Sequence, residues 1–431
     1  MTFTRDASSA VDVAIVGAGA AGLATAIFLR RANAARSTVL LDGARRTGAK
    51  ILVSGGTRCN LTNRIVTERD FWGGRPAIVG RILRSFTADD AVAWFREMGV
   101  ALHEEPDGKL FPDSGGARGV LNALLGEIEA AGADLRADHR VLDIERGDES
   151  FGVVTTRGVF QARCVVLATG GRSLPKTGSD GGGYDLARKL GHTIVPATPA
   201  LAPLVLDATA EGAVHSRLSG VSHDVELAVW VDGRITTRIA GSLLWTHFGI
   251  SGPVSLNASR HWLRAQLEGR TVRLTANFCP GVTFDAEDER WIASCAARPK
   301  ASVSTALAQR VPASVAAALL GVLAIEPLTP LAHLSREDRR LLVRALVEWP
   351  LPVVASRGYN FAEATAGGVS LDEIEPSTME SRKCRGLYLV GEVLDVDGRI
   401  GGFNFQWAWS SGFVAGRALA ALNPERRTKS G

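Results

Sequence analysis

Cysteine is scarce in this sequence, and long uncharged apolar runs are absent. The five cysteines lie at least 16 positions apart, which excludes a CxxC redox pair and the close ligand spacing of a zinc site. The longest apolar run, residues 311–325, is too short to span a bilayer. The first strand is expected from residue 11, after a polar lead that does not have the pattern of a signal peptide. We therefore expect a cytoplasmic protein with no membrane partner and no metal site.

The sequence also lacks an excess of charge of either sign. Its 49 lysines and arginines are set against 45 aspartates and glutamates, and the net charge of +4 is spread along the chain. Such a balance does not indicate a positively charged surface for nucleic acid, so we expect a small-molecule substrate and no nucleic-acid partner. With 431 residues, 46% of them hydrophobic, the chain is long enough for two or three domains with buried cores. The oligomeric state is not predicted.

One glycine-rich motif organises the N-terminal part of the chain. An apolar run at residues 13–16 is followed by Gly17-Ala18-Gly19-Ala20-Ala21-Gly22 and then by an alanine- and leucine-rich helix. Gly17 permits a tight strand-to-helix turn, Gly19 lets the backbone approach a pyrophosphate, and Gly22 lets the helix pack on the sheet. The helix N-terminus adds unpaired N–H groups and a partial positive charge. We interpret these six residues as a phosphate-binding turn.

Asp42 ends the second apolar run, 20 residues after Gly22. A carboxylate at this distance can accept hydrogen bonds from a ribose 2′-OH, and it would repel a 2′-phosphate. Together with the glycine turn it predicts a dinucleotide site, but it does not distinguish FAD from NAD.

A second glycine-rich segment follows at residues 48–63, GAKILVSGGTRCNLTN. Its glycines and small polar residues predict a loop whose N–H donors lie close to the ligand. Lys50 can neutralise a pyrophosphate or be a plain surface charge, and Cys59 can face the cofactor or be a packed thiol. The cofactor-binding residues predicted in this segment are Gly48, Lys50, Gly55, Gly56, Cys59 and Asn60.

Two further glycine turns are predicted beside the first. Short strands within residues 140–167, with a turn at Arg157-Gly158, return the chain to an ATGG turn. Near the C-terminus, residues 386–406 are predicted as short strands separated by glycine-rich turns, and a helix follows over about residues 407–422. The N-terminus of this helix would stabilise negative charge on a reduced flavin. Glu392 and Asp397 can accept hydrogen bonds from ribityl hydroxyls, position a turn, or be solvated. Cofactor contacts are expected from Ala168, Thr169, Gly170, Gly171, Gly391, Glu392, Asp397, Gly402, Phe403, Asn404 and Gln406.

The number of dinucleotide-binding fingerprints in the sequence distinguishes FAD from NAD as the resident cofactor. Only one is present, because the glycines at 181–183 do not follow a strand, and a resident nicotinamide domain would add a second. One nucleotide half, a returning glycine pair and a C-terminal glycine-rich strand–loop–helix are the three parts that hold a long, two-headed cofactor. We therefore predict FAD, with NAD(P)H as a diffusible co-substrate.

The middle of the chain differs in character from both ends. Residues 225–239 alternate around Asp232-Gly233, a strong local signal for a β-hairpin. Residues 285–349 have helical periodicity, with a capping box at residues 335–338. The predicted organisation is an FAD-binding Rossmann-like domain at residues 1–194 and 353–431, an inserted β-rich domain at residues 195–284, and a helical subdomain of the insert at residues 285–352.

Seven stretches carry a family resemblance, at residues 17–22, 48–63, 108–125, 168–184, 243–259, 365–382 and 386–416. They resemble the bacterial NAD(P)/FAD-dependent oxidoreductases grouped with the aminoacetone-oxidase-type FAD-binding enzymes and the bile-acid-inducible flavoprotein. One departure is Thr57, where that family usually has a third glycine. The resemblance implies an α/β flavoprotein of the two-dinucleotide-binding-domain type, with an inserted β-barrel-like domain and a small helical subdomain. It strengthens the cofactor prediction and does not specify the reaction.

The expected chemistry is hydride transfer between the flavin N5 and a small organic substrate. The candidate substrate loop is residues 245–253, in the inserted domain, where that domain would fold over the flavin. His247 in this loop can act as an acid or base, or be a structural hydrogen-bonding group. Two alternatives are a flavin-dependent RNA-modifying enzyme, which salt-sensitive RNA binding would favour, and a flavin-binding protein without turnover, whose flavin would resist every physiological reductant.

Overall fold

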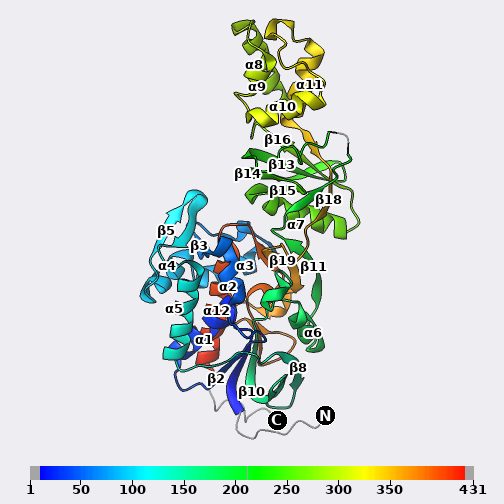
Figure 1. The fold of residues 1–431 in the computed structure, drawn as a ribbon. Coiled ribbons are helices and arrows are strands. Elements are labelled where there is room, and N and C mark those ends of the chain that lie inside the picture. Colours follow the sequence, from blue (N-terminus) through cyan, green and yellow to red (C-terminus); the bar gives the residue numbers. More distant parts are fainter. Residues whose placement is uncertain (1–9, 211, 423–431) are drawn as a thin grey trace. The chain divides into compact units, whose positions relative to one another are not determined.

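The computed structural model describes residues 10–210 and 212–422. Within them the chain forms two compact units, one with residues up to Ala197 and from Glu363 onward, the other Thr198–Ala362 (Figure 1). The first unit is therefore built from two segments that are distant in the sequence. The finer division predicted from the sequence, with a separate helical part at residues 285–352, remains a prediction.

A nine-stranded sheet forms the centre of the first unit. Seven of its strands follow one another in the order β20 (Ile374–Glu375), β21 (Glu380–Ser381), β22 (Leu387–Leu389), β10 (Gly158–Leu167), β1 (Ala10–Val16), β2 (Thr38–Leu41) and β7 (Asp134–Arg136), and a meander of β8 (Val141–Arg146) and β9 (Phe151–Thr155) joins β10. β1 runs parallel to both β10 and β2, and Val16 is level with Leu167 and Leu41. Because parallel strands end at the same edge, the turns that follow β1, β2 and β10 come together there. This is a Rossmann-type arrangement, as predicted.

Helices and three small sheets complete the first unit. The helices are α1 (Ala20–Ala32), α2 (Ala49–Val53), α3 (Pro76–Ser85), α4 (Ala88–Glu97), α5 (Gly116–Ala130), α6 (Gly182–Lys189) and α12 (Phe403–Ala421). The small sheets pair β3 (Thr62–Asn63), β6 (Lys109–Pro112) and β5 (Leu102–Glu105); β23 (Val396–Gly398) and β4 (Phe71–Gly73); and β11 (Ile194–Ala200) and β19 (Ala364–Val369).

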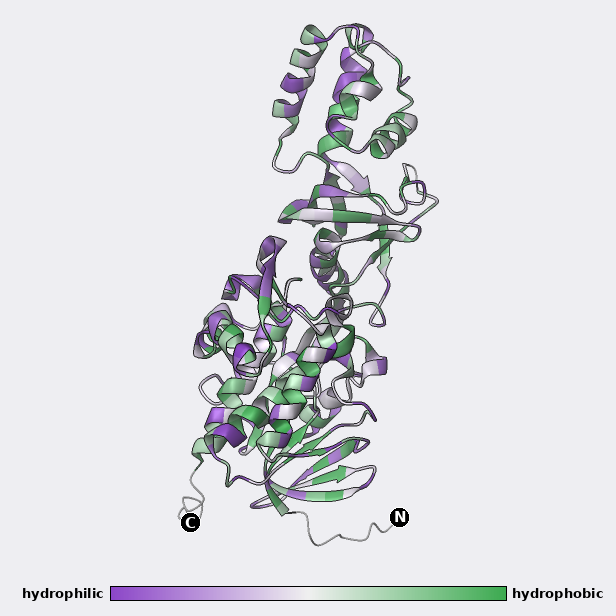
Figure 2. Ribbon diagram, turned by 60° about the vertical axis from the view of Figure 1, so that its left-hand side comes forward, coloured by the Kyte–Doolittle hydropathy of each residue, from purple (hydrophilic) through white to green (hydrophobic). Residues whose placement is uncertain are grey.

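An aromatic cluster joins the N-terminal helix α1 to the C-terminal helix α12. The ring of Phe28 lies 5.0 Å from that of Phe413 and 4.7 Å from that of Trp94, and Trp94 lies 5.7 Å from Trp409. Such contacts bury large apolar areas and fix the relative position of the helices. Hydrophobic colouring runs through the strands and helices of this unit in Figure 2.

Two local predictions in the first unit were wrong in detail. The segment at residues 48–63 was predicted as a loop, but it contains the short helix α2, because Ile51 is buried in the core and the residues around it are helix formers. The last helix begins at Phe403, and not near Trp407, because Gly402 adopts the left-handed conformation that starts it. Residues 403–406 are therefore its first turn.

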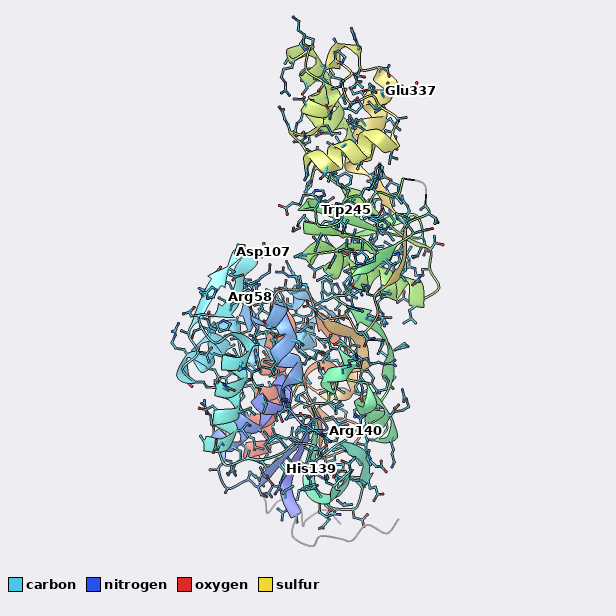
Figure 3. The ribbon with its side chains drawn as sticks, viewed as in Figure 1. Arg58, Asp107, His139, Arg140, Trp245 and Glu337 are labelled. Atoms are coloured by element: carbon cyan, nitrogen blue, oxygen red, sulfur yellow. The ribbon has the colours of Figure 1, made fainter. Side chains whose placement is uncertain are left out.

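The second unit contains a seven-stranded sheet. Its strands are β17 (Trp349–Leu351), β16 (Val272–Asn277), β13 (Ser222–Val231), β14 (Arg234–Thr246), β15 (Gly249–Ser251), β12 (Leu204–Leu206) and β18 (Val353–Ser356), in this order. The predicted hairpin is confirmed, since β13 and β14 pair around Asp232 and Gly233, whose φ angles are 49° and 79°. Trp245, labelled in Figure 3, is buried in this unit. It donates a hydrogen bond from Nε1 to His223 Nε2 at 3.1 Å.

Helices account for the rest of the second unit. They are α7 (Pro253–Leu267), α8 (Phe284–Ala297), α9 (Val303–Leu307), α10 (Ala313–Val322) and α11 (Arg336–Val347). The predicted cap of α11 is present, because Ser335 Oγ accepts a hydrogen bond from Asp338 N at 3.0 Å. Among the described residues, no helix is long and apolar enough to cross a bilayer.

Candidate functional site

The turn between β1 and α1 has no room for side chains at two of its glycines. Gly17 has a φ of +102°, and a Cβ placed there would lie 2.5 Å from the carbonyl oxygen of Ala168. A Cβ at Gly22 would overlap the carbonyl oxygen of Gly17. The motif therefore brings the first glycine turn into direct contact with the turn that follows β10.

Gly19 has different surroundings. A Cβ at this position would meet no atom of the described chain within 4 Å. Gly19 is also the N-cap of α1, which has no side-chain cap and no acidic residue in its first turn among the described residues. The start of α1 is thus uncapped by any side chain in the described chain and has open space at Gly19, which suits the pyrophosphate of a dinucleotide.

Asp42 directly follows β2, beside this turn. Its Oδ2 accepts a hydrogen bond from Ala18 N at 3.1 Å, and its Oδ1 accepts one from Ala44 N at 2.8 Å. Burial raises the pKa of Asp42, while these two backbone N–H groups act in the opposite direction. Each carboxylate oxygen keeps a second lone pair, so the group can still accept from ribose hydroxyls.

Unpaired polar atoms collect around the second glycine turn. Thr169 Oγ1 and Ser179 Oγ are buried and have no hydrogen-bond partner in the described chain. A third such atom is Asn60 Oδ1, in the predicted glycine-rich segment. Buried polar atoms without partners are uncommon in folded proteins, and a bound polar ligand would satisfy them. Together with the open space at Gly19, they fit a dinucleotide cofactor.

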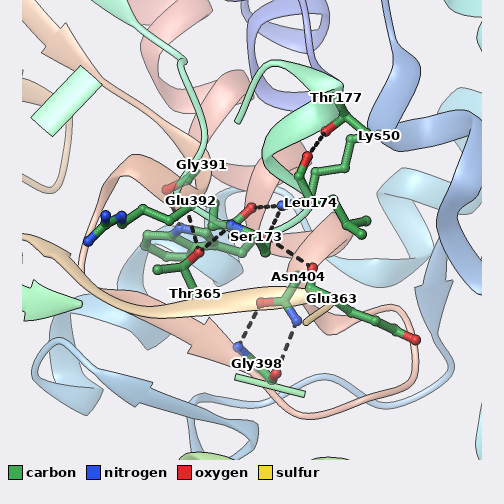
Figure 4. A network of polar contacts seen from close by, with 12 residues as sticks. Lys50, Ser173, Leu174, Thr177, Glu363, Thr365, Gly391, Glu392, Gly398 and Asn404 are labelled. Atoms are coloured by element: carbon green, nitrogen blue, oxygen red, sulfur yellow. Dashed lines mark hydrogen bonds and ion pairs between the residues drawn. The ribbon is translucent and has the colours of Figure 1, made fainter. Parts of the chain in front are cut away.

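A polar network joins three distant segments of the first unit (Figure 4). Lys50 Nζ forms an ion pair with Glu392 Oε2 and donates to Ser173 Oγ at 2.5 Å. Ser173 Oγ also donates to Glu392 Oε1 at 2.9 Å. Thr365 Oγ1 accepts from the backbone N–H groups of Arg172 and Ser173 at 2.8 and 3.0 Å. Lys50 is thus paired with Glu392 within the chain, and its contact with a pyrophosphate remains a prediction.

The N-terminus of α12 forms the other end of the site. Gly402 is its N-cap, with a φ of +92°, and a Cβ there would overlap the carbonyl oxygen of Thr62. No side chain in the described chain caps this helix, and its first turn has no acidic residue. The side chain of Asn404 closes the preceding loop instead, because its Oδ1 accepts from Gly398 N at 2.8 Å and its Nδ2 donates to Gly398 O at 3.0 Å.

Gln406 does not have a free amide for a ligand. Its Oε1 accepts from Thr62 Oγ1 at 2.7 Å, and its Nε2 donates to Phe86 O at 2.9 Å and to Ser410 Oγ at 3.1 Å. Both amide hydrogens are used within the protein. Gln406 thus helps to position α12, and its contact with the flavin rim remains a prediction.

Over residues 11–418 the sequence matches the family described as HI0933-like protein Rossmann domain. The chain belongs to this family. A 3-dehydro-bile acid delta(4,6)-reductase from Clostridium scindens is 31% identical over 408 residues, which are 95% of this chain and 98% of that protein. Two ribosomal RNA dihydrouridine synthases, from Escherichia coli and Haemophilus influenzae, are 32% and 33% identical over 95% and 94% of this chain and 98% of each relative.

The family resemblance recognised in the sequence is confirmed. The chain is an FAD-dependent oxidoreductase of the HI0933-like family, and its first unit has a Rossmann-type sheet. The polar atoms and open space described above would hold that cofactor.

Several residues predicted to contact FAD make packing contacts within this HI0933-like chain, and their contact with FAD remains a prediction. Cys59 is fully buried, and burial raises the pKa of its thiol to about 12, which favours a packed thiol over one that faces the cofactor. A Cβ at Gly48 would overlap the side chain of Leu121. The N–H of Gly391 donates to Ser411 Oγ at 3.0 Å, and its carbonyl accepts from Trp407 Nε1 at 3.1 Å. Two other predicted residues, Asp397 and Phe403, are buried as well.

Asp397 and Phe403 were also predicted to contact the cofactor, and both side chains are buried. Asp397 is buried within β23, level with Trp72 of β4. Phe403 is fully buried, with its ring 6.1 Å from that of Phe71 and the guanidinium of Arg399 over it at 4.2 Å. Ala18 and Ala21 are also buried, whereas Gly56 resembles Gly19, because a Cβ there would meet no atom of the described chain within 4 Å.

Four residues of the site were missed in the sequence: Ser173, Ser179, Thr365 and Thr62. Ser173 and Ser179 follow the ATGG turn, and Thr365 precedes a glycine pair in a stretch that carries the family resemblance. For Ser173 and Ser179, the position shortly after a glycine turn is the sequence signal that could have identified them as site residues. His247, the predicted acid or base, belongs to the second unit and is exposed there, with its ring 5.2 Å from that of Phe248.

Proposed function

We propose that this protein uses NAD(P)H to reduce a carbon–carbon double bond conjugated to a carbonyl group in a small organic molecule. One observation carries the proposal: two uncapped helix N-termini, at Gly19 of α1 and Gly402 of α12, come from opposite ends of the chain within one unit. Each can stabilise negative charge, one on a pyrophosphate and one on a reduced flavin. NAD(P)H would bind transiently, since the sequence holds a single nucleotide fingerprint.

The residues of the first unit have distinct tasks in this proposal. The start of α1 binds phosphate oxygens, and Asp42 accepts from ribose hydroxyls. The ion pair of Lys50 and Glu392 fixes the segments around Ser173, and the start of α12 favours the anionic, reduced state of the ring system. When bound, FAD supplies hydride transfer through its isoalloxazine ring.

The choice of an activated double bond rests on the chemistry that the names of the relatives have in common. Dihydrouridine differs from uridine by two hydrogens across a ring double bond that is conjugated to a carbonyl. A delta(4,6)-reductase of a 3-dehydro steroid acts on double bonds conjugated to a ketone. In both reactions a hydride adds to the carbon distal to the carbonyl, and a proton adds to the neighbouring carbon. His247 is our candidate for holding that proton, because the two ring nitrogens of an imidazole can donate and accept a proton.

The proposal is tested by anaerobic titration of the FAD-loaded protein. NADPH or NADH should bleach the flavin absorbance, and a screen of conjugated enones and saturated ketones should find that enones alone restore it. His247→Gln should slow reoxidation and leave bleaching unchanged. Bleaching that no enone reverses would contradict the proposal.

A second candidate is reduction of a uracil base in ribosomal RNA. The names of the two dihydrouridine synthases favour it, and a uracil ring offers the same conjugated double bond. The balanced charge of the chain does not favour it. Binding of ribosomal RNA that weakens steeply with salt, and formation of dihydrouridine in that RNA, would identify this function in place of the first.

A further inference from the structure

An arginine in the second unit lies over two phenyl rings. The guanidinium carbon of Arg357 is 3.5 Å from the ring centroid of Phe361 and 4.5 Å from that of Phe248. Phe248 is in the turn that joins β14 to β15, and the other two residues follow β18. We call Phe248, Arg357 and Phe361 the arginine clamp.

The sheet holds both sides of the clamp in place. Leu204 of β12 is level with Ile250 of β15 on one side and with Ser356 of β18 on the other. At the ends of this strand, Arg357 N donates to Pro203 O at 2.9 Å, and Leu206 N donates to Phe248 O at 3.1 Å. A site attached to paired strands keeps its geometry better than one on an unsupported loop.

The guanidinium of Arg357 has no carboxylate partner and donates no hydrogen bond within residues 10–210 and 212–422. Another arginine of the same unit that lies over an aromatic ring is neutralised. Arg273 lies 3.8 Å from the Trp230 ring, and its Nη2 is 3.5 Å from Glu348 Oε1. Arg357 therefore keeps a charge and a set of donors that the fold does not use.

The rings leave those donors accessible. A guanidinium donates in its own plane, and neither ring is a hydrogen-bond partner of its N–H groups in the described chain, so the planar fork remains available to a bidentate oxyanion. Phe361 is 47% exposed, and the imidazole of His247 beside Phe248 is exposed as well. The clamp thus combines an unpaired cation with apolar surface open to solvent.

We propose that the arginine clamp is a binding subsite of the second unit for an oxyanion, and that this oxyanion is the carboxylate of a small organic acid. The rings suit an apolar body beside the charged group, so the proposed ligand is an organic acid with an apolar body. The phosphates of NADPH are the other source of the same chemistry.

The test uses full-length, FAD-loaded, oxidised protein and two steroid enones, 3-oxo-4-cholenoate and its uncharged methyl ester. Calorimetry should show that the wild type binds the acid roughly tenfold or more tightly than the ester, as expected for a hydrogen-bonded charge pair. Arg357→Gln should reduce this ratio to about one, and Arg357→Lys should give an intermediate ratio, because lysine keeps the charge without the fork. The matched control Arg273→Gln should keep the wild-type ratio.

Three outcomes would overturn the proposal. They are equal binding of acid and ester by the wild type, binding of neither ligand, and an unchanged ratio in Arg357→Gln. A raised KM for NADPH in that variant, with the ratio kept, would assign the clamp to nucleotide phosphate instead. Binding does not depend on turnover, so an acid that binds through Arg357 but does not reoxidise the flavin would contradict the proposed function and leave the clamp intact.

Discussion

Lys50 and Glu392, which are 342 positions apart in the sequence, form an ion pair in the first unit, and both side chains bond to Ser173. The pair ties the glycine-rich segment after β2 to the C-terminal strand and loop. Both partners are largely shielded from solvent, with 26% and 19% of their side chains exposed. Partial burial of this kind strengthens the interaction between the charges and penalises the loss of either one.

A double-mutant cycle on Lys50→Met and Glu392→Gln should therefore give a coupling energy of about 1–2 kcal/mol in urea unfolding of the FAD-free protein. The matched control is Arg75→Met with Asp372→Asn, because that pair is 2.6 Å apart but more than half exposed. Its coupling should be close to zero. Equal coupling energies for the two pairs would contradict the claim that partial burial strengthens the Lys50–Glu392 ion pair.

Alanine at two glycines of one motif should have different effects. Gly17→Ala strains the backbone and collides with Ala168, so it should destabilise the FAD-free protein by about 1–3 kcal/mol. Gly19→Ala meets no protein atom in the described chain and should leave the FAD-free stability within about 0.5 kcal/mol of wild type, while FAD affinity falls at least about tenfold. Unfolding curves and flavin fluorescence titration measure both. Unchanged FAD affinity in Gly19→Ala would place the phosphates elsewhere.

Stability of the first unit should fall as the pH drops below about 6.5, partly because of His192. Burial lowers the pKa of this residue from 6.5, although Glu373, 2.9 Å from its Nδ1, acts in the opposite direction. The unfolded chain therefore binds more protons below pH 6.5, and protonation favours unfolding. His192→Gln should flatten the dependence of the unfolding free energy on pH between 7.5 and 5.5. An unchanged slope in His192→Gln would contradict the assignment.

Cys59 should be chemically inert in the native protein. Burial raises its pKa to about 12, so very little thiolate is present at pH 8. Iodoacetamide should label Cys59 only after unfolding, as peptide mass spectrometry can show. Acid precipitation should release all flavin into the supernatant, and flavin retained on a peptide with Cys59 would contradict this account.

Local sequence signals predicted much of the fold. The strand, glycine turn and helix at residues 13–32 and the hairpin at Asp232-Gly233 each depend on a few neighbouring residues, so their patterns are readable without tertiary information. The start of α12 was placed late because aromatic residues and asparagine are weak helix formers, and Gly402 begins the helix through backbone conformation alone.

Contacts between distant segments were not predictable in the same way. The sequence places Gln406 in a polar glycine-rich stretch, but only the fold brings Thr62 and Phe86 to its amide. The same holds for Thr365 beside the ATGG turn and for Arg357 over two phenyl rings. Their partners are set by strand order and register, which a single sequence does not specify.

The central claim is that the two ends of this chain together bind one FAD in the first unit. The most direct measurement is a flavin titration of the isolated protein against the variants Gly19→Ala and Gly402→Ala, one at each helix N-terminus. The wild type should bind one FAD per chain with micromolar or tighter affinity, and each variant should bind at least about tenfold more weakly. A wild type that remains colourless and does not take up FAD below millimolar concentration would contradict the claim.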